Sequence, residues 1–305
     1  MDIPKKLLLI GYLSGLKQEK LAQKLEVSFV TLNSWVNGRS QPHPKKEQQI
    51  DELYRKYTGQ TFIPTHVLEA KKKGLLIKSK AHKNILKTIL SRPDLYDQFM
   101  LSLTYNTNSI EGSTLSENET AAILFQNKNI PNKTLIEHLE AKNHQAAYKF
   151  LLTHLAKKGK LDEALILKLH SILMNGIQDD AGFYRRHGVR IVASRVVTAN
   201  YLKVPVLMKE IEGLISAKKL DVIGHISQIH ARFEKIHPFS DGNGRVGRLL
   251  MVAMLLKANL PPAIVLQENK QLYYTYLAKA QTEEDCSLLE DFVCDAIREG
   301  FGMFE

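Results

Sequence analysis

Hydrophobic residues recur at helical spacing along most of the chain, so the sequence predicts a mainly α-helical protein. Residues 1–60 are expected to form a compact helical unit, with its first two helices over residues 5–13 and 18–25. Ser28 is a good N-cap for a third helix, which ends just before Gly38.

After this unit, residues 61–93 form a basic connector that contains Lys71, Lys72 and Lys73. We expect a solvated helical linker here, and the alternative is an extra contact to a nucleic-acid backbone. The helical pattern then resumes. Further helices are expected near residues 94–110, 117–126, 134–157, 162–176, 206–218, 222–236, 245–258, 270–282 and 286–299.

One segment breaks the helical period. Residues 188–204 are rich in β-branched side chains and lie between two helical stretches. This composition predicts a short β-hairpin. The expected fold class is therefore mainly α with one hairpin.

The net charge of +10 is concentrated in the first third of the chain. Residues 1–100 hold 18 Lys and Arg against 9 Asp and Glu, whereas residues 101–305 hold 24 against 23. This asymmetry is typical of a module that faces a polyanion and is attached to an electrically neutral body.

Membrane insertion and export are not expected from this sequence. The longest apolar run, residues 249–256, has eight residues, far fewer than the roughly 20 that span a bilayer. Residues 5–10 imitate a short signal peptide, but no small-residue cleavage site follows, and helical periodicity explains the leucines. Only two cysteines are present, so we expect a cytoplasmic protein in a reducing compartment.

The densest chemistry lies in residues 237–248, His-Pro-Phe-Ser-Asp-Gly-Asn-Gly-Arg-Val-Gly-Arg, between two strongly helical segments. Pro238 and the run Gly242-Asn243-Gly244 force a loop. The loop leads into a helix N-terminus, where free backbone N–H groups bind anions. Because glycines let these groups approach a phosphate closely, we predict a phosphate site here.

Charged side chains accompany the predicted phosphate site. Arg245 and Arg248 are three residues apart on one side of the helix, and their guanidinium groups suit bidentate phosphate contacts. Asp241 offers an oxygen ligand to a phosphate-bound Mg²⁺. His237 is a side chain that can act as a general base on a hydroxyl at neutral pH.

The glycines also satisfy the GxGxxG pattern of dinucleotide-binding proteins, with Gly242, Gly244 and Gly247. That fingerprint requires a preceding strand and an acidic residue about 20 positions later. The preceding segment is helical and the downstream position is the apolar stretch 261–266, so this interpretation is rejected. The sequence contains no GxxxxGK[ST], which excludes a P-loop.

Residues 237–248 match the Fic-domain motif HxFx(D/E)GNGRxxR at every specified position, so the chain resembles the Fic family. The resemblance implies a helical Fic core with a β-hairpin flap over residues 134–305. It also implies transfer of AMP from ATP to a Ser, Thr or Tyr hydroxyl of a target protein or of the chain itself, with release of pyrophosphate. ATP would be the substrate and Mg²⁺ the metal cofactor.

The same resemblance assigns roles to residues of the motif. His237 would deprotonate the target hydroxyl, and Asp241 would hold Mg²⁺. The phosphates of ATP would be bound by Gly242, Asn243, Gly244, Arg245 and Arg248.

Two segments outside the motif extend the resemblance. The hairpin would be the flap that holds a target segment by β-addition, and a purely structural hairpin is the alternative. Tyr273 and Gln281 lie on the helix that covers the adenine in this family, and a core aromatic is the alternative for Tyr273. The expected flap residues are Val189, Arg190, Ile191 and Val192.

The segment from Thr107 to Gly112, Thr-Asn-Ser-Ile-Glu-Gly, resembles the inhibitory motif [S/T]xxxE[G/N] of the family. It lies in the expected inhibitory helix region, residues 94–133. The resemblance implies that Glu111 pairs with Arg248 and so removes the cation that the γ-phosphate of ATP needs. The alternative is a surface residue at a helix end. The same carboxylate could position a water for the reverse reaction, removal of AMP from a target.

Residues 1–60 resemble the helix-turn-helix of phage-repressor-like regulators. Residues 28–37 would be the recognition helix in the major groove of DNA. Because this helix has no Arg, Lys or Gln at its outward positions, an adaptor that recruits the target is the alternative. The candidate base contacts are Phe29, Thr31, Asn33 and Ser34, with Arg39 on phosphate.

The expected function is thus an autoinhibited protein adenylyltransferase with a DNA-binding domain. The alternative is a transcription regulator whose Fic domain only senses a nucleotide. The intact His237 favours the enzyme, because a sensor needs the phosphate site but no base. The sequence leaves open which target is modified, which DNA is bound and whether the chain forms a homodimer.

Overall fold

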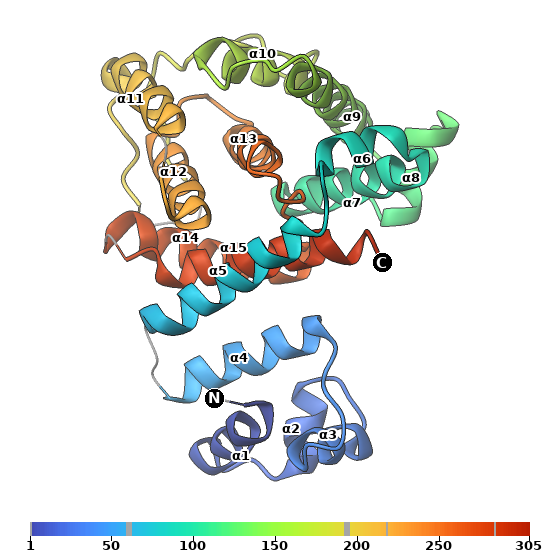
Figure 1. Ribbon diagram of the computed structural model, residues 1–305. Coiled ribbons are helices and arrows are strands. Elements are labelled where there is room, and N and C mark those ends of the chain that lie inside the picture. The colour runs from blue at the N-terminus through green and yellow to red at the C-terminus, as the bar shows by residue number, and fades with distance from the viewer. Residues whose placement is uncertain (1, 59–62, 192–195, 218, 284) are drawn as a thin grey trace. The chain divides into compact units, whose positions relative to one another are not determined.

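The computed structural model describes residues 2–58, 63–191, 196–217, 219–283 and 285–305 (Figure 1). The chain divides into two compact units, Met1–Ile63 and Pro64–Glu305. The first unit contains the helices α1 (Ile3–Ser14), α2 (Gln18–Lys24), α3 (Phe29–Val36) and α4 (Pro44–Thr58).

The second unit holds the remaining described helices and two short 3₁₀ turns, η1 (Tyr201–Lys203) and η2 (Gln267–Asn269). Its helices are α5 (Thr65–Lys80), α6 (Ile85–Ser91), α7 (Pro93–Glu111), α8 (Glu117–Gln126), α9 (Leu135–Ala156), α10 (Glu163–Leu173), α11 (Val204–Ser216), α12 (Val222–Ile236), α13 (Asn243–Lys257), α14 (Lys270–Thr282) and α15 (Ser287–Gly302).

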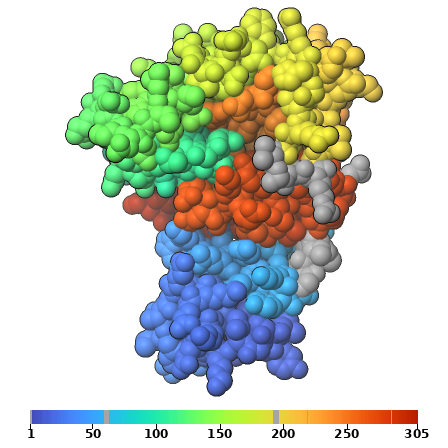
Figure 2. Space-filling view, turned by 180° about the vertical axis from the view of Figure 1, so that it is seen from behind, coloured from blue at the N-terminus to red at the C-terminus, as the bar shows by residue number. Residues whose placement is uncertain are grey.

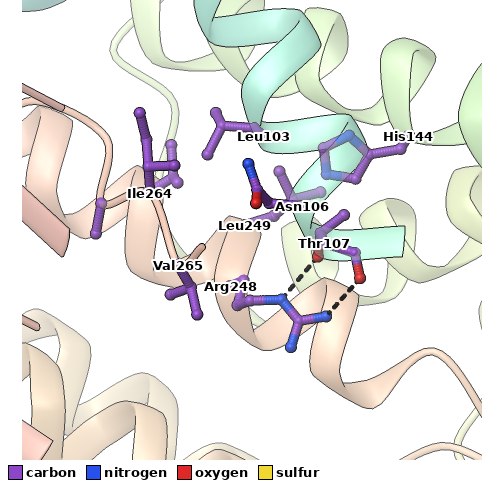
Figure 3. A pocket seen from close by; sticks show the side chains of 10 residues that line it. Leu103, Asn106, Thr107, His144, Arg248, Leu249, Ile264 and Val265 are labelled. Carbon is purple, nitrogen blue, oxygen red and sulfur yellow. Dashed lines mark hydrogen bonds between the residues drawn. The ribbon is translucent and has the colours of Figure 1, made fainter. Parts of the chain in front are cut away.

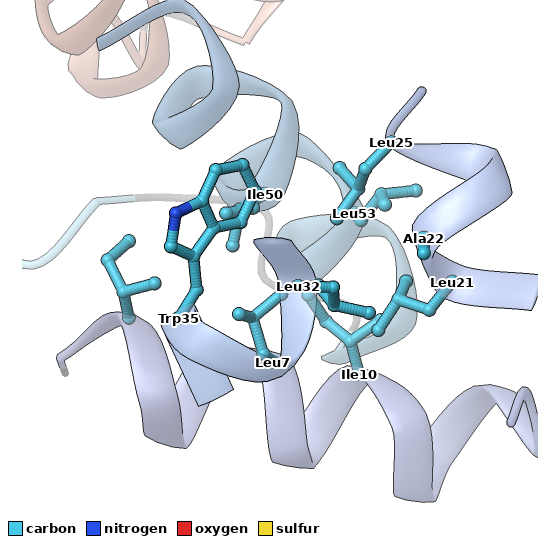
Figure 4. Close-up of a cluster of buried hydrophobic side chains, with 10 residues drawn as sticks. Leu7, Ile10, Leu21, Ala22, Leu25, Leu32, Trp35, Ile50 and Leu53 are labelled. Atoms are coloured by element: carbon cyan, nitrogen blue, oxygen red, sulfur yellow. The ribbon is translucent and has the colours of Figure 1, made fainter. Parts of the chain in front are cut away.

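The first unit is a small helical bundle around one core. Ser28 caps α3 by accepting a hydrogen bond from the backbone N–H of Thr31 at 3.0 Å. Glu26 takes a left-handed conformation in the turn between α2 and α3, with φ of 53°. Apolar side chains from all four helices fill the core, as the close-up shows (Figure 4): Leu7, Ile10, Leu21, Ala22, Leu25, Leu32, Trp35, Ile50 and Leu53.

Helix α13 is the centre of the second unit. It contacts α7, α9, α10 and α12, which surround it in Figure 1. In the space-filling view, the orange part of the chain, which includes α13, is visible only as a narrow area between the green and yellow segments (Figure 2). A helix that is apolar on every side needs such a surrounding, which explains the apolar run over residues 249–256.

Most of the basic connector belongs to the second unit, where α5 packs against α15 rather than being solvated along its length. Lys71 of α5 pairs with Asp291 at 2.7 Å and with Asp295 at 2.8 Å, both on α15. Lys72 pairs with Glu290 of α15 and with Asp221. These two lysines are therefore engaged by carboxylates and do not face a nucleic acid, whereas Lys73 is exposed.

The hairpin expected over residues 188–204 is wrong for the part that the structure describes. Residues 188–191 and 196–200 form irregular segments without strand pairing, and residues 201–204 begin η1 and α11. The two segments are joined by the Thr198 hydroxyl, which donates to the carbonyl of Val189 at 2.8 Å. β-Branched residues favour extended backbone, but a two-stranded ribbon without a neighbouring sheet is marginal in water.

Three of the four expected flap residues lie in the first of these segments. Arg190 is exposed, Val189 and Ile191 are half-buried, and Val192 lies outside the described residues. In the described parts of the chain, every helix is too short or too polar to span a lipid bilayer.

Candidate active site at the start of helix α13

The motif loop connects α12 to α13 with two left-handed residues. His237 ends α12 with φ of 53°, and Gly242 precedes α13 with φ of 75°. Asn243 bridges the loop, because its side chain accepts from the N–H of Phe239 and donates to the carbonyl of the same residue, both at 2.9 Å. The Asn243 side chain, which we expected at the phosphates, is thus used to shape the loop.

Phe239 is fully buried and anchors the loop. Its ring stacks on His170 of α10 with centroids 3.7 Å apart. The Nε2 atom of His170 is 3.1 Å from the carbonyl oxygen of Asp241, and its Nδ1 accepts from the N–H of Gly182 at 2.8 Å. His170 therefore fixes the loop through Phe239 and Asp241. The sequence did not reveal this role because α10 and the motif loop are far apart in the chain.

The first turn of α13 is covered by a carboxylate. Glu111, the last residue of α7, forms an ion pair with Arg248. A Cβ placed on Gly244 would overlap the Oε1 atom of Glu111, so this oxygen lies against the first turn of the helix. Gly112 follows with φ of 112°, a left-handed conformation that ends α7.

Arg248 is bound by α7 at two points. Its Nε donates to the Thr107 hydroxyl at 2.7 Å, and Nη2 donates to the Thr107 carbonyl at 3.4 Å (Figure 3). Nη2 also donates to Glu111. Burial opposes ionisation of Glu111, but the charge and hydrogen bond of Arg248 outweigh it and hold the pKa of Glu111 below its ordinary value. The pair is therefore charged at neutral pH.

A small cavity lies behind Arg248, with Leu103, Asn106, Thr107 and His144 on its other sides (Figure 3). Its volume of about 20 Å³ is enough for roughly one water molecule and far too small for a nucleotide.

Arg245 pairs with Glu140, whereas Arg248 pairs with Glu111. The Nη1 atom of Arg245 is 2.7 Å from Oε1 of Glu140 on α9, and its Nη2 is 3.4 Å from Oδ2 of Asp241. The side chain of Arg245 is only 3 % exposed, whereas that of Asp241 is 54 % exposed. The two arginines of the motif thus do not form one free cationic surface in this structure, and Glu140 is a partner that sequence reasoning missed.

His237 is oriented with one ring nitrogen toward the protein. Its Nδ1 donates to the carbonyl of Glu234 at 3.1 Å, which leaves the lone pair on Nε2. Burial lowers the pKa of His237 below its ordinary value, although the bond to Glu234 acts in the opposite direction. The imidazole is therefore neutral at pH 7 and can accept a proton.

Tyr273 and Gln281 of α14 are core residues rather than open nucleotide contacts. Tyr273 is 1 % exposed, and its hydroxyl is 2.6 Å from Nε2 of His230. Gln281 is buried and donates to the carbonyl of Ala231 at 3.2 Å. The alternative stated for Tyr273, a core aromatic, is the one the structure favours.

Tyr274, the residue after Tyr273, is half-buried and therefore more exposed than Tyr273. The charges of Glu111 and Arg248 act on the pKa of Tyr274, and Arg248 acts on the pKa of Tyr273 as well. Lys270 lies over the ring of Tyr274 at 5.9 Å from the centroid. Two adjacent tyrosines in the sequence predict an aromatic side chain beside the site. The orientation of α14 about its own axis determines which of the two faces the site.

A buried acid lies behind His237. Glu234 of α12 has its Oε2 3.9 Å from Nδ1 of His237. A Cβ on Gly247 would overlap Oε1 of Glu234, so the glycine makes room for this side chain. The pKa of Glu234 is raised to about 8: burial is the largest cause, Arg248 lowers the pKa and Glu111 raises it. Its inward position, three residues before His237, was a signal that sequence reasoning did not use.

The expected DNA contacts lie on and beside α3. Phe29 is 45 % exposed and Arg39 is exposed. The other three polar side chains are engaged locally: Thr31 with Ser28 at 2.8 Å, Asn33 with Asn37 at 2.5 Å and Ser34 with Ser40 at 2.8 Å.

The expected metal ligand, Asp241, is a single carboxylate. The described parts of the chain contain no group of three or more His, Cys, Asp or Glu side chains that could hold a metal ion. Asp241 offers a half-exposed carboxylate beside the helix N-terminus, with Oδ1 accepting from the N–H of Gly242 at 2.6 Å. One carboxylate fits Mg²⁺, which commonly takes its other ligands from substrate phosphates and water.

Comparison with known proteins agrees with this geometry. Residues 160–255 match the Fic/DOC family, and residues 7–57 match a helix-turn-helix family. Proteins named protein adenylyltransferase Fic from *Culex quinquefasciatus* and *Aedes aegypti* are 29 % and 30 % identical to the chain over 196 residues. Each match covers 63 % of this chain but 39 % of the relative, so the chain matches about two-fifths of the length of these relatives.

Solved structures show the same fold. A Fic family protein from *Desulfovibrio desulfuricans* is 25 % identical, with a TM-score of 0.66 over 78 % of this chain and 73 % of that chain. Fic-1 from *C. elegans* is 22 % identical, with a TM-score of 0.66 over 98 % of this chain and 97 % of that chain. The resemblance predicted from residues 237–248 is confirmed: the chain is a Fic/DOC-domain protein related to the protein adenylyltransferases named Fic, with an N-terminal helix-turn-helix domain.

Proposed function

We propose that this chain is an autoinhibited protein adenylyltransferase, which transfers AMP from ATP to a hydroxyl of a target protein and releases pyrophosphate. The observation that carries the proposal is the carboxylate of Glu111 over Gly244, paired with Arg248. A negative group held between a helix N-terminus and an arginine marks an anion site. In an active enzyme that anion would be a phosphate of ATP.

The reaction would begin with the target hydroxyl near Nε2 of His237. His237 accepts the proton while the hydroxyl oxygen attacks the α-phosphorus, and the bond to the pyrophosphate oxygen breaks. Backbone N–H groups at the start of α13 and the guanidinium of Arg248 would stabilise the charge on the phosphates. Arg245 would orient Asp241, with which it forms an ion pair.

Asp241 would hold Mg²⁺ at the phosphates, and the ion supplies neutralisation of their negative charge. The half-exposed carboxylate of Asp241 supports this assignment.

Glu111 would keep the enzyme inactive in the state described above. Its carboxylate takes the cation that a distal phosphate would use, and its Oε1 occupies space over Gly244. ATP could then reach the site only with its phosphates displaced from in-line geometry. Relief of inhibition requires Glu111 to leave Arg248, which demands movement or local unwinding at the end of α7.

The segment around residues 188–199 would bind the target. Its described residues are irregular and without strand pairing, and Arg190 is exposed. A target segment that adds as a further strand would supply the missing pairing. We propose Val189, Arg190 and Ile191 as the described residues of this flap. Tyr274 is proposed to contact the nucleotide in place of Tyr273.

The helix-turn-helix domain is proposed to bind DNA through α3. The match over residues 7–57, the basic charge of the first third of the chain and the exposure of Phe29 and Arg39 support this assignment. Binding to a target protein instead of DNA is the outcome that would favour an adaptor.

Labelled ATP tests the proposed transfer. The Glu111→Gly variant, incubated with Mg²⁺ and a cell lysate, should transfer label to protein from α-labelled ATP but not from γ-labelled ATP. Addition of His237→Ala to this variant should abolish the transfer, while nucleotide still binds. If the variant binds ATP but labels no protein, including itself, the domain is a nucleotide sensor.

A further inference from the structure

One buried arginine connects the proposed flap to the end of α12. Arg185 is 2 % exposed and lies in the segment between α10 and η1. Its guanidinium donates to four backbone carbonyls: Nε to His237 at 2.7 Å, Nη1 to His187 at 2.7 Å, and Nη2 to Ala199 and, at 3.3 Å, to Ile236. Its own backbone N–H donates to the carbonyl of Pro238 at 3.0 Å.

Two of these carbonyls belong to the proposed base, His237, and to the residue before it, Ile236. The carbonyls of Ile236 and His237 lie at the C-terminal end of α12, where the helix itself offers no partners. His237 has a left-handed backbone, which is unfavourable for a non-glycine residue and persists only when its surroundings hold it. Arg185 supplies that hold by binding the carbonyls on both sides of the His237 nitrogen.

The other two carbonyls lie at the two ends of the proposed flap. His187 directly precedes the segment that contains Val189 and Ile191, and Ala199 is at the end of the second segment. Farther from Arg185, the Thr198 hydroxyl joins the same two arms through the carbonyl of Val189. A single planar group thus contacts both arms of the flap and the residue that carries the base.

No ion pair compensates the charge of Arg185 among the described residues. Burial lowers the pKa of this guanidinium, and the groups that face it are carbonyl dipoles. A buried cation without a carboxylate is costly. Its fixed fork is suited to several acceptors at defined angles, which a lysine ammonium cannot reproduce.

We propose that Arg185 is a positioning residue that fixes the distance between the bound target segment and Nε2 of His237. The inference rests on the proposed function and goes beyond it. It proposes that one side chain outside the motif determines where the bound target segment lies relative to His237. Arg185 contacts neither the start of α13 nor Arg248 in the bonds described above. Loss of the Arg185 guanidinium should therefore reduce the transfer of AMP to the target hydroxyl and leave nucleotide binding intact.

The test compares Arg185→Lys with Arg186→Lys, both in the full chain that carries Glu111→Gly. Arg186 is its exposed neighbour and provides a matched control. We expect Arg185→Lys to lower the maximal rate of AMP transfer at least about ten-fold, since small misplacement of reacting groups has large effects on rate. The KM for ATP and the calorimetric affinity for a non-hydrolysable ATP analogue should change less than about two-fold. The control should match its parent.

Limited trypsin digestion supplies a readout that does not depend on transfer. Cleavage after Arg190 should be faster in Arg185→Lys than in the control, because the arms are no longer held. If the Glu111→Gly parent labels no protein, the proposed function fails, and this cleavage together with nucleotide affinity still tests the connection. Unchanged cleavage would then overturn it.

A second variant covers the case in which Arg185→Lys does not fold. Thr198→Val removes the outer bond between the arms and leaves Arg185 in place, so it should lower transfer and raise cleavage to a smaller extent. The proposal is overturned if Arg185→Lys, or Thr198→Val in its place, transfers AMP at the rate of the control. A loss of ATP affinity in proportion to the loss of rate would also overturn it, because that indicates general damage to the site.

Discussion

Glu111 and Arg248 are 137 positions apart in sequence and form an ion pair over the first turn of α13. Thr107, one helical turn before Glu111 on α7, holds the Nε side of the same guanidinium. A single turn of α7 therefore engages Arg248 with a carboxylate and a hydroxyl. The account of this chain as an inhibited enzyme depends on that relationship.

The first prediction concerns the pH dependence of transfer. Burial lowers the pKa of His237, so its base form persists below the pH at which an exposed histidine is half-protonated. In the Glu111→Gly variant, the rate should be constant between about pH 7 and 8 and should fall only at pH values below about 6.5. Single-turnover rates across this range measure the profile. A rate that falls already between pH 8 and 7 would contradict the direction of the shift.

The second prediction concerns Glu234 and stability. Its folded-state pKa of about 8 lies above the ordinary value of 4.5, so the folded protein keeps a proton that the unfolded chain releases. The contribution of this group is fully present below pH 4.5 and is lost as the pH rises through 8. Glu234→Gln should therefore gain stability relative to the parent as the pH increases, by at most about 1.4 kcal/mol per pH unit.

Urea unfolding at pH 5 and pH 8 measures this gain. Glu69→Gln, at an exposed position of α5, is the control and should show the same difference from the parent at both pH values. A difference between Glu234→Gln and the parent that does not change with pH would show that Glu234 is ionised in the folded protein.

The third prediction concerns the ion pairs of α5. Lys71→Ala removes a cation from Asp291 and Asp295, whose side chains are 8 % and 9 % exposed, and should destabilise the second unit by about 3 kcal/mol. Lys73→Ala, two positions away and exposed, should change stability by less than about 0.5 kcal/mol. Thermal unfolding of both variants tests the packing of α5. Equal melting temperatures would mean that α5 is a solvated linker.

The fourth prediction concerns DNA. If α3 lies in the major groove, the affinity for duplex DNA should fall steeply with salt concentration, because phosphate contacts release counterions. Arg39→Ala should reduce the slope of log affinity against log salt by about one. Lys56→Ala, at an exposed position of α4, should leave the slope unchanged. Filter binding over a range of salt concentrations gives the slope, and an affinity independent of salt would favour the adaptor.

The sequence predicted those parts of the site that depend on contiguous residues. The loop and the helix start over residues 237–248 follow from proline, glycine and the helical pattern on both sides, and the chemistry of this segment needs little tertiary information. Glu111 was expected beside Arg248 only through the resemblance of its short motif. Nothing in the hydrophobic pattern alone brings these two residues together.

The parts that were missed depend on packing. The period of α14 is compatible with either Tyr273 or Tyr274 facing the site, and only the packed core shows that Tyr273 is buried against His230. The run of lysines in α5 appeared solvated because its acidic partners are distant in sequence: Asp221 is 149 residues from Lys72, and Asp291 is 220 residues from Lys71. Arg185 carried no signal, since its acceptors are backbone carbonyls, which every residue has.

The most direct test of the central claim is the rate of AMP transfer in four proteins: the parent, Glu111→Gly, Arg248→Ala and the double variant. If Glu111 inhibits by holding Arg248, Glu111→Gly should raise the rate at least about ten-fold over the parent, as expected for release of a coupling of more than about 1.4 kcal/mol. The same substitution should have little effect when Arg248 is alanine. Equal rates for the parent and Glu111→Gly would contradict the account.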